Sequence, residues 1–458
     1  KVDAFVKKIM IDEVEPQMNK DLPSMLKGLR FSHMNLGNHT PKLGPISAYK
    51  TTHDGAKLKI DLDYDSDMHF EVGYDYLKAG VQRMEIKGQV TVVVDQLIGD
   101  APLIGGVLVY FVNAPTVTTE FTQLLGALDI AVVKSAFEFA VRRVLKSFCV
   151  LPNYIPMALG GPNKGVDRAM IRSLPPRGVL RLTLLKVNTD TNMDDEVWGV
   201  SEWTGDKSDI YVRLALMDQE WTSEAVSDTL QPVWSKNNVV DLLVYDRAQG
   251  MQMEVLDDDI LQDDWIGHTT LHVGEATGGN HLRTLYTHDG AIGGNLTFRG
   301  EWFGTDIAGK GDFDKCFVVV KVRGVDMPSS FGFGDKAIVR AKVPGVPEQA
   351  TPLDGVFEGM EKGLIKEAVK QGAVFPDVNI DRAMYFLVSK EGLADQTVSL
   401  DLQDASGNPI SDQPLTVDIS KALDAEDLGF SGPFAFQTSR GEVNASMRIE
   451  VWGLTRDL

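Results

Sequence analysis

The residues best suited to chemistry in this chain form an acidic stretch between two apolar segments. Residues 255–267 read Val-Leu-Asp-Asp-Asp-Ile-Leu-Gln-Asp-Asp-Trp-Ile-Gly, with five aspartates in eight positions at a predicted strand end. Like charges crowded in this way repel one another unless a cation compensates them. Oxygen ligands on a loop suit calcium, which takes about six to eight of them, better than zinc or copper. The stretch predicts a calcium site; the alternative is a solvated acidic loop.

Two further segments extend this pattern. Residues 205–212 carry carboxylates at the start of a predicted strand, and residues 229–234 read Thr-Leu-Gln-Pro-Val-Trp. In this order and spacing the three segments resemble a C2 domain, in which loops distant in sequence meet around shared calcium ions. The resemblance implies that the metal ligands are Asp206, Asp209, Asp257, Asp259, Asp263 and Asp264.

Parts of this ligand set stay open. The early loop ligand is one of Asp194, Asp195 and Asp206, because an insertion lengthens that loop, and the late ligand is Asp263 or its neighbour Asp264. The chain departs from the C2 pattern at Ile210, where proline is usual, and at Gln231, where asparagine is usual, but neither change removes a carboxylate. Four apolar residues near these loops either insert into a membrane or pack against a neighbouring domain: Trp198, Trp203, Ile260 and Leu261.

No set of residues indicates catalysis. The eight histidines are scattered, and the chain contains neither a glycine-rich phosphate loop nor a Gly-x-Ser-x-Gly elbow. The two cysteines, Cys149 and Cys316, are far apart and provide no disulfide framework, so we expect buried free thiols. The sequence predicts a protein that is not an enzyme.

The charge of the chain restricts its partners. The net charge is −20, and residues 1–160 carry 17 basic and 18 acidic side chains, so the acidity belongs to the remainder. This balance argues against nucleic acid as a partner, because its binding depends on Lys and Arg. It also opposes docking on anionic lipid unless calcium reverses the sign locally.

The first third of the chain predicts two helices around an antiparallel sheet. Apolar residues at helical spacing indicate an amphipathic helix over residues 1–29, broken near Pro16 and Pro23. From residue 45 to about residue 120 the apolar residues alternate with a period of two, which is typical of half-exposed antiparallel strands. A second helix is expected over residues 129–148, stopped by Leu151-Pro152-Asn153.

This arrangement resembles a synaptotagmin-like mitochondrial lipid-binding (SMP) domain over about residues 1–157. The marks are Leu29-Arg30-Phe31 before Asn35-Leu36-Gly37, then Ala114-Pro115-Thr116-Val117, then Cys149-Val150-Leu151-Pro152-Asn153. An SMP domain followed by a C2 domain is the architecture of extended synaptotagmins, tricalbins and plant synaptotagmins. The resemblance implies a multidomain protein of α+β and all-β type, a tubular lipid-binding fold followed by two antiparallel β-sandwiches.

In that family the inward face of the SMP sheet lines a channel for glycerolipid acyl chains. The alternative is a sheet that simply covers a protein core. The residues expected to line the channel are Leu58, Ile60, Leu62, Phe70, Val72, Met84, Ile86, Val90, Val92, Val107, Val109 and Phe111.

The rest of the chain divides into two units of similar size. We expect a linker over residues 158–177, rich in glycine and proline, a C2 domain over residues 178–305, and a degenerate C2-like repeat over residues 312–458. The repeat contains an inserted helix over residues 355–371. Its sparse acidic residues predict no calcium site: Asp326, Asp335, Asp401 and Asp404.

The resemblance predicts a lipid-transfer and tethering protein of membrane contact sites. It would carry glycerophospholipids, dock on an anionic membrane surface when calcium binds, and form a homodimer through the SMP domain. Its expected place is the cytosolic face of membranes at endoplasmic reticulum contact sites, held by an anchor outside this chain. The alternative is a scaffold whose tube holds no lipid and whose acidic sandwiches bind proteins.

Overall fold

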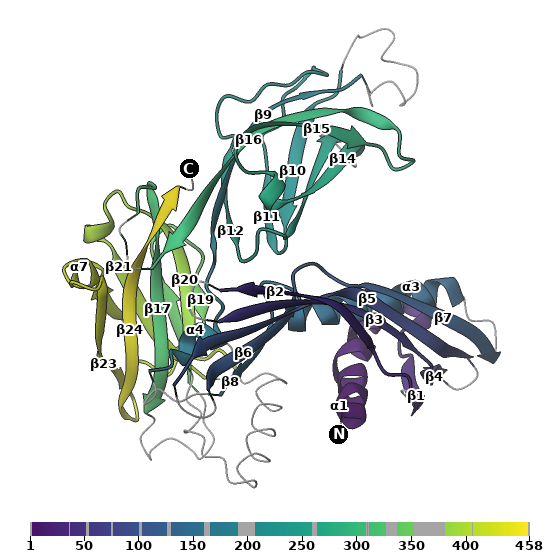
Figure 1. Ribbon diagram of the computed structural model, residues 1–458, viewed down its shortest axis with the longest axis horizontal. Coiled ribbons are helices and arrows are strands. Elements are labelled where there is room, and N and C mark those ends of the chain that lie inside the picture. Colours follow the sequence, from purple (N-terminus) through teal and green to yellow (C-terminus); the bar gives the residue numbers. More distant parts are fainter. Residues whose placement is uncertain are drawn as a thin grey trace. The chain divides into compact units, whose positions relative to one another are not determined.

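The computed structural model describes residues 2–35, 37–51, 55–74, 77–99, 103–125, 130–159, 165–190, 207–258, 263–307, 309, 311–326, 337–351, 381–404 and 406–456. The chain forms two compact units, residues 1–167 and 168–458 (Figure 1). No helix among the described residues is long and apolar enough to span a membrane.

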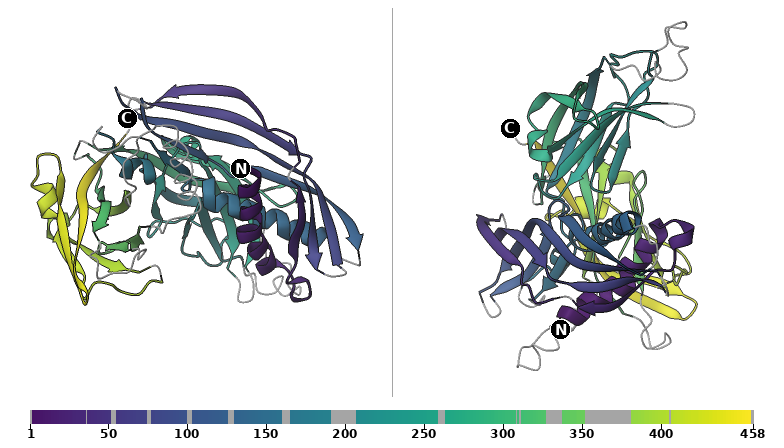
Figure 2. Two further views of the ribbon diagram at one scale, coloured as in Figure 1. Left: turned by 90° about the horizontal axis from the view of Figure 1, so that it is seen from below. Right: turned by 90° about the vertical axis from the view of Figure 1, so that its right-hand side faces the viewer.

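Unit 1 is an antiparallel sheet with helices on one side (Figures 1 and 2). Its strands are β1 (Arg30–Asn35), β2 (Lys42–Lys50), β3 (Ala56–Ser66), β4 (His69–Tyr74), β5 (Leu77–Leu97), β6 (Ile104–Phe111), β7 (Thr116–Leu125) and β8 (Ile155–Ala158). The 21-residue β5 organises the sheet: its first half pairs with β4 and β7, and its second half pairs with β3 and β6. Strands β2 and β8 extend the second half on its two sides.

The helices of unit 1 cover only the first half of this sheet. They are α1 (Val2–Ile9), the π-helical turn η1 (Met10–Val14), α2 (Glu15–Asp21) and α3 (Ile130–Cys149). Side chains of η1, α2 and α3 form one core with apolar residues of β1, β4, β5 and β7. Phe137 of α3 lies at its centre, 5.6 Å from the ring of Phe70. The second half of the sheet receives no such cover from these helices.

Near Pro16 the helix changes its hydrogen-bond pattern rather than ending. The π-helical turn Met10–Val14 precedes α2, and Pro16 lies in the first turn of α2, with the backbone helical on both sides. The helical segment ends before Pro23, as the sequence predicted. The second helix, expected over residues 129–148, is confirmed as Ile130–Cys149.

Unit 2 contains two sandwiches that share six strand pairings. The first comprises β9 (Gly178–Asn188), β10 (Ile210–Leu216), β11 (Gln219–Thr222), β12 (Val239–Val244), β13 (Gly250–Asp257), β14 (Asp264–His272), the 3₁₀ turn η5 (Val273–Glu275), β15 (Gly279–Tyr286) and β16 (Ile292–Asp306). The second comprises β17 (Lys315–Asp326), β18 (Ile338–Lys342), β19 (Gln349–Ala350), β20 (Arg382–Ser389), η6 (Leu393–Asp395), β21 (Thr397–Gln403), β22 (Leu415–Asp418), α7 (Ser420–Leu423), β23 (Gly429–Thr438) and β24 (Gly441–Arg456).

The two sandwiches are repeats of one topology. The pairings β9–β12, β9–β16, β10–β11, β10–β13, β13–β14 and β15–β16 recur as β17–β20, β17–β24, β18–β19, β18–β21, β21–β22 and β23–β24. A side-chain device recurs as well. Gln219 exchanges two hydrogen bonds with the backbone of Leu243, and Gln349 does the same with Tyr385 on the equivalent strand. The predicted repeat is therefore present, and its predicted inserted helix over residues 355–371 lies outside the described residues.

The sandwiches have separate cores and join through a third apolar cluster. This cluster includes Phe303, Phe313, Phe317 and Trp452, and β16 pairs with β24 beside it. Asp241 of the first sandwich accepts hydrogen bonds from Arg181 at 2.7 Å and 2.8 Å and lies 2.6 Å from Lys315 of the second. Both cysteines are buried free thiols, as predicted.

Candidate functional site

The uncovered half of the unit 1 sheet presents one continuous apolar face. Strand register places its side chains in rows that cross neighbouring strands, because residues opposite one another point to the same side. One row runs Ala48, Leu58, Val92, Val109, Ile155, and the next runs Ile46, Ile60, Val90, Phe111. The flanking rows are Lys50, Ala56, Val94, Val107, Met157 on one side and Leu43, Leu62, Gly88 on the other. We call this surface the open face.

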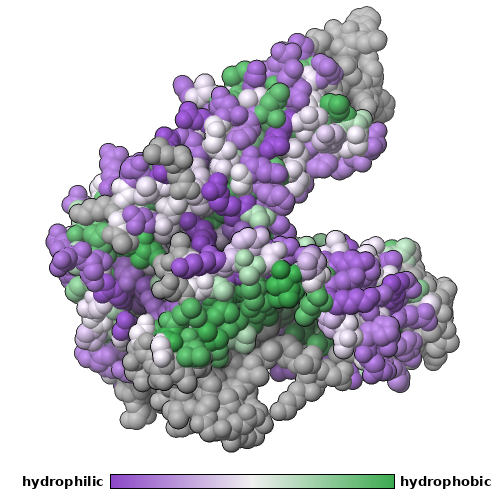
Figure 3. Space-filling view, viewed as in Figure 1, coloured by the Kyte–Doolittle hydropathy of each residue, from purple (hydrophilic) through white to green (hydrophobic). Residues whose placement is uncertain are grey.

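Most side chains of the open face are only partly buried. Leu58, Ile60, Val90, Val92 and Val109 are all half-buried. At the edge strand β2, Leu43 is 65% exposed and Ile46 is 61% exposed. Figure 3 shows a broad hydrophobic area on the part of unit 1 where Figure 1 draws β6 and β8. An exposed apolar surface of this extent indicates that a ligand or a partner binds there.

Three of the predicted channel residues lie in the helix-covered core instead. Phe70 and Val72 are fully buried and Met84 is 6% exposed, all packed among residues of the helices. Ile86 is partly buried at the edge of the same core. Gly88 marks the transition, because a Cβ there would lie 3.0 Å from Pro115 Cβ and 3.2 Å from the Phe111 ring. Protein side chains fill one half of the sheet, and the other half is left for another occupant.

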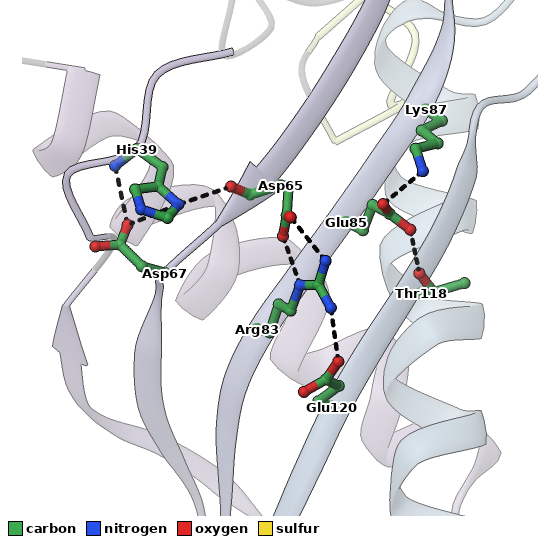
Figure 4. Close-up of polar contacts among 8 residues, drawn as sticks. All are labelled: His39, Asp65, Asp67, Arg83, Glu85, Lys87, Thr118 and Glu120. Atoms are coloured by element: carbon green, nitrogen blue, oxygen red, sulfur yellow. Dashed lines mark hydrogen bonds and ion pairs between the residues drawn. The ribbon is translucent and has the colours of Figure 1, made fainter. Parts of the chain in front are cut away.

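The opposite side of the sheet is polar around Arg83 (Figure 4), whereas directly behind the open face Val93, Leu108 and Tyr110 are buried. Arg83 on β5 donates to both carboxylate oxygens of Asp65 on β3, at 2.6 Å and 2.7 Å, and to Glu120 on β7 at 2.9 Å. The hydrogen bonds from Arg83 lower the pKa of Asp65. Farther along β5, Lys87 lies 2.6 Å from Glu85, and this contact lowers the pKa of Glu85.

The dimensions of the open face suit an extended hydrocarbon chain. Its four rows are spaced by two residues along a strand, which gives a length of roughly 20 Å, and its five strands give a similar width. Lys50 is the only charged residue in the four rows and lies at the edge. The middle of the face therefore offers apolar contact without a hydrogen-bonding group, which favours acyl chains over polar ligands.

The acidic loops of the first sandwich are partly described. Strand β10 begins at Ile210, directly opposite Asp257 at the end of β13, so Asp209 and Asp257 are brought together. Asp257 Oδ1 accepts the backbone N–H of Asp209 at 2.6 Å. The backbone carbonyl oxygen of Asp209 accepts the N–H of Asp258 at 2.9 Å. Asp206 and Asp259 lie outside the described residues, as do Asp194, Asp195, Trp198, Trp203, Ile260 and Leu261.

One oxygen atom at this tip needs a further partner. Asp257 is 1% exposed, and its Oδ2 atom accepts no hydrogen bond among the described residues. Burying a carboxylate oxygen without a partner is unfavourable by several kcal/mol in order of magnitude, and a bound cation removes that cost. The donor set at the tip is entirely oxygen, which fits calcium. The described residues do not by themselves supply a group of three ligands.

The two late aspartates differ in their surroundings. Asp263 is exposed, and its Oδ2 accepts the hydroxyl of Tyr211 at 2.7 Å. Burial and this hydrogen bond raise the pKa of Tyr211 to about 12. Asp264 begins β14 opposite Asp257. The hairpin therefore brings the ends of the acidic stretch back to the strand pair that holds Asp209 and Asp257.

At the equivalent described positions of the second sandwich, strand register places no pair of carboxylates. Ile338 begins β18 opposite Gln403 of β21, so Ala337 and Gln403 stand where the first sandwich has Asp209 and Asp257. The nearby Asp404 carboxylate accepts hydrogen bonds from the backbone N–H groups of Ser406 and Asn408 and from the Asn408 side chain, all within its own turn. The two central carboxylates of the first tip are thus absent from the equivalent positions.

Sequence reasoning missed five residues of the open face. These are Leu43, Ile46, Val94, Ile155 and Met157. Val94 continues the period-two pattern of its strand, so that pattern could have predicted it. Ile155 and Met157 follow the second helix and join the sheet only through long-range pairing with β6, which local periodicity does not predict.

Comparison with known proteins agrees with this architecture. The family model of the synaptotagmin-like mitochondrial lipid-binding domain matches residues 2–160, and the C2 domain model matches residues 178–287. Extended synaptotagmin-2-B of Xenopus laevis is 24% identical over 377 residues, which cover 80% of this chain and 41% of the relative. Extended synaptotagmin-1 of Rattus norvegicus is 28% identical over 302 residues, covering 65% of this chain and 27% of the relative.

A solved structure supports the same fold. It contains the SMP domain of extended synaptotagmin 2 together with two C2 domains. It matches with a TM-score of 0.62 at 19% identity, covering 99% of this chain and 95% of the other. The chain spans about two fifths or less of the length of the two curated relatives named above.

Proposed function

Because the chain belongs to the extended synaptotagmins, with an SMP domain followed by a C2 domain and a degenerate C2-like domain, we propose that it carries glycerophospholipids and tethers membranes. The proposed domains are the SMP domain over residues 1–157, the C2 domain over residues 178–305 and the degenerate C2-like domain over residues 312–458. The SMP domain would hold the lipid and the first sandwich would dock on a membrane. The observation that carries the proposal is the open face.

A lipid that leaves a bilayer loses a large free energy of apolar contact, which such a face can partly replace. About 0.8 kcal/mol is lost for each methylene transferred from hydrocarbon to water, so two acyl chains with roughly 30 methylenes would lose over 20 kcal/mol. Half-buried side chains such as Leu58 and Val92 replace part of the hydrocarbon contact that the lipid leaves behind. The barrier to leaving a bilayer falls accordingly, and the polar head group stays in water at the open side.

The helix-covered half is excluded from the lipid site in this proposal. Its core is closed by Phe137 and its neighbours, so Phe70, Val72 and Met84 support the sheet rather than contact lipid. The proposed contact residues are Leu58, Ile60, Leu62, Val90, Val92, Val107, Val109 and Phe111, together with Ile46, Val94, Ile155 and Met157.

The first sandwich is proposed to dock on anionic membranes when calcium binds. Asp209 and Asp257 would hold the ion, with Asp263 or Asp264 completing the site and Asp206 and Asp259 as further ligands. When bound, calcium would neutralise the tip and link it to lipid phosphates. The protein's own contribution is the Asp209 backbone N–H, which orients the Asp257 carboxylate.

The remaining parts of the proposal concern location and assembly. We propose that the protein acts at the cytosolic face of endoplasmic reticulum contact sites, as a homodimer through its SMP domain and without enzymatic activity. The alternative function is a scaffold without lipid, which the filled half of the sheet and the net charge of −20 favour.

Mass spectrometry of organic extracts from the purified chain separates the two functions. Carriage predicts glycerophospholipid in roughly stoichiometric amount after expression in a lipid-replete cell, and a scaffold predicts none. Vesicle sedimentation with and without calcium tests docking independently. Asp257→Asn should abolish the calcium-dependent part, and an unchanged calcium response would contradict the proposed ion site.

A further inference from the structure

The chain enters unit 2 through a short helix that the sandwiches largely bury. This helix is α4 (Arg168–Arg172), and four of its five residues are buried, including Arg168 and Arg172. Segments that connect domains normally run over the surface in contact with water. We call residues 168–177, from α4 to the start of β9, the entry segment. The burial of two arginines in a connecting segment indicates that it has a specific binding site.

Charged contacts hold the start of the entry segment on the second sandwich. Arg168 Nε lies 3.4 Å from Oδ2 of Asp381, the residue before β20. The guanidinium of Arg382, which is 8% exposed, donates to the backbone carbonyl oxygen of Arg172. α4 therefore packs against β20 (Figure 1). Buried guanidinium groups are unfavourable without partners, so these contacts favour one alignment of α4 and β20.

Backbone and apolar contacts continue along the same strand. The backbone N–H of Ala383 donates to Ser173 Oγ at 2.9 Å, and the hydroxyl of Tyr385 donates to the Ser173 carbonyl oxygen at 2.6 Å. Ala169 of α4 belongs to the apolar cluster that joins the two sandwiches. The first half of the entry segment is thus bound along β20 in a defined register.

The end of the entry segment is held by the first sandwich. Thr305 Oγ1 donates to the carbonyl oxygen of Pro176 at 2.8 Å, and the N–H of Arg177 donates to the carbonyl oxygen of Val244 at 2.7 Å. Of the described core residues of the two sandwiches, none comes from the entry segment. Each sandwich can therefore keep its core when the entry segment leaves β20.

We propose that the second sandwich is a docking module for the chain's own entry segment, which it binds reversibly as a short arginine-bearing helix. Docking shortens the free connection that precedes the first sandwich. Released and fully extended, the entry segment would add at most roughly 35 Å to that connection. In a protein that carries lipid and tethers membranes, as proposed above, this contact limits the reach of the tether. It also gives the second sandwich a role that needs no calcium.

The test uses the full chain and trypsin, which cleaves after arginine. Docking should protect the Arg172–Ser173 bond. Arg168→Glu places a carboxylate against Asp381 and should raise cleavage of this bond by about tenfold or more, because cleavage follows the population of the released form. Arg177→Glu, the matched control, makes the same charge change at an exposed position of the same segment and should leave the rate unchanged.

A charge exchange makes this test specific. The double variant Arg168→Glu, Asp381→Arg restores opposite charges at the pair and should recover most of the protection. Equal cleavage of the Arg172–Ser173 bond in Arg168→Glu and Arg177→Glu, or rapid cleavage of this bond in the unmodified chain, would overturn the proposal. Mass spectrometry of the fragments identifies the bond that is cut.

Hydrogen exchange distinguishes docking from ordinary folding of unit 2. Tyr385→Phe removes only the hydroxyl that binds Ser173, so amide exchange over residues 168–173 should accelerate while exchange in β17 and β24 stays unchanged. If β17 and β24 accelerate together with the entry segment in this variant and in Arg168→Glu, the segment is an inseparable part of the fold and the proposal is wrong. Neither measurement involves lipid or calcium, so docking and lipid carriage can fail independently.

Discussion

A single carboxylate at the centre of the open face tests lipid carriage with little disturbance of the fold. Val92 stands in the row between Leu58 and Val109, and all three are half-buried. In the lipid-free protein the carboxylate of Val92→Asp can reach water. With an acyl chain over the face it cannot, and Lys50, the charged residue of the neighbouring row, lies two strands away, roughly 10 Å.

The expected loss follows from that geometry. Removing an ion from water without a partner costs several kcal/mol, and allowing for partial exposure we take about 3 kcal/mol. Since 1.4 kcal/mol corresponds to about a factor of ten in affinity, the affinity for lipid should fall by roughly 100-fold. Val92→Thr, which adds only a hydroxyl, should lose about tenfold or less.

The assay is phospholipid per chain by mass spectrometry, with thermal unfolding measured on the same samples. Ser47→Asp is the matched control, because Ser47 is exposed on the polar side of β2 and faces Lys59. It should retain lipid and unfold at nearly the original temperature. Full lipid content in Val92→Asp, or equal loss in Ser47→Asp, would refute the assignment of lipid to the open face.

Three further predictions concern the rest of the chain. Asp257→Asn keeps the acceptor for the Asp209 N–H but should remove the rise in unfolding temperature caused by calcium, whereas Asp404→Asn should leave that rise intact; equal rises in both would contradict the ion site. Asp241→Asn should lower the free energy of unfolding of unit 2 by about 2 kcal/mol in a denaturant titration, because it leaves two cations without their shared partner. Burial acts to raise the pKa of Asp241, but hydrogen bonds from its two basic partners lower that pKa overall. The ion pairs of Asp241 therefore stabilise the fold above the ordinary pKa of 3.8, and this stabilisation is lost as the pH falls through the pKa of the folded state. Acid sensitivity that persists unchanged in the Asn variant would refute this. Cys149 and Cys316 should resist a thiol reagent at neutral pH until the chain unfolds, because burial raises the pKa of each to about 11, and rapid reaction of the folded chain would contradict their burial.

The sequence predicted those features that depend on local pattern. Alternation identified the strands of β3, β5 and β6, and helical spacing identified α3 to within one residue at each end. The acidic stretch was correctly placed at a strand end, because apolar strand residues precede Asp257 and follow Asp264. Each of these features depends on residues that are close together in the sequence.

The division of the sheet into an open and a covered half was not predictable in this way. Phe70 and Ile60 have the same alternation, yet Phe70 contacts Phe137 and Ile60 does not lie in that core. The difference depends on where α2 and α3 end relative to β5, which is a long-range property. The missed contribution of Ile155 and Met157 has the same cause, since β8 reaches β6 only through the fold.

The most direct test of the central claim is photo-crosslinking with a phospholipid whose acyl chain carries a diazirine, followed by peptide mapping of the full chain. Lipid on the open face predicts crosslinks on β3, the second half of β5, β6 and β8, and few on α3 or on the polar side of β3 and β7. Crosslinks confined to the helix-covered half, or spread over both sides equally, would contradict it.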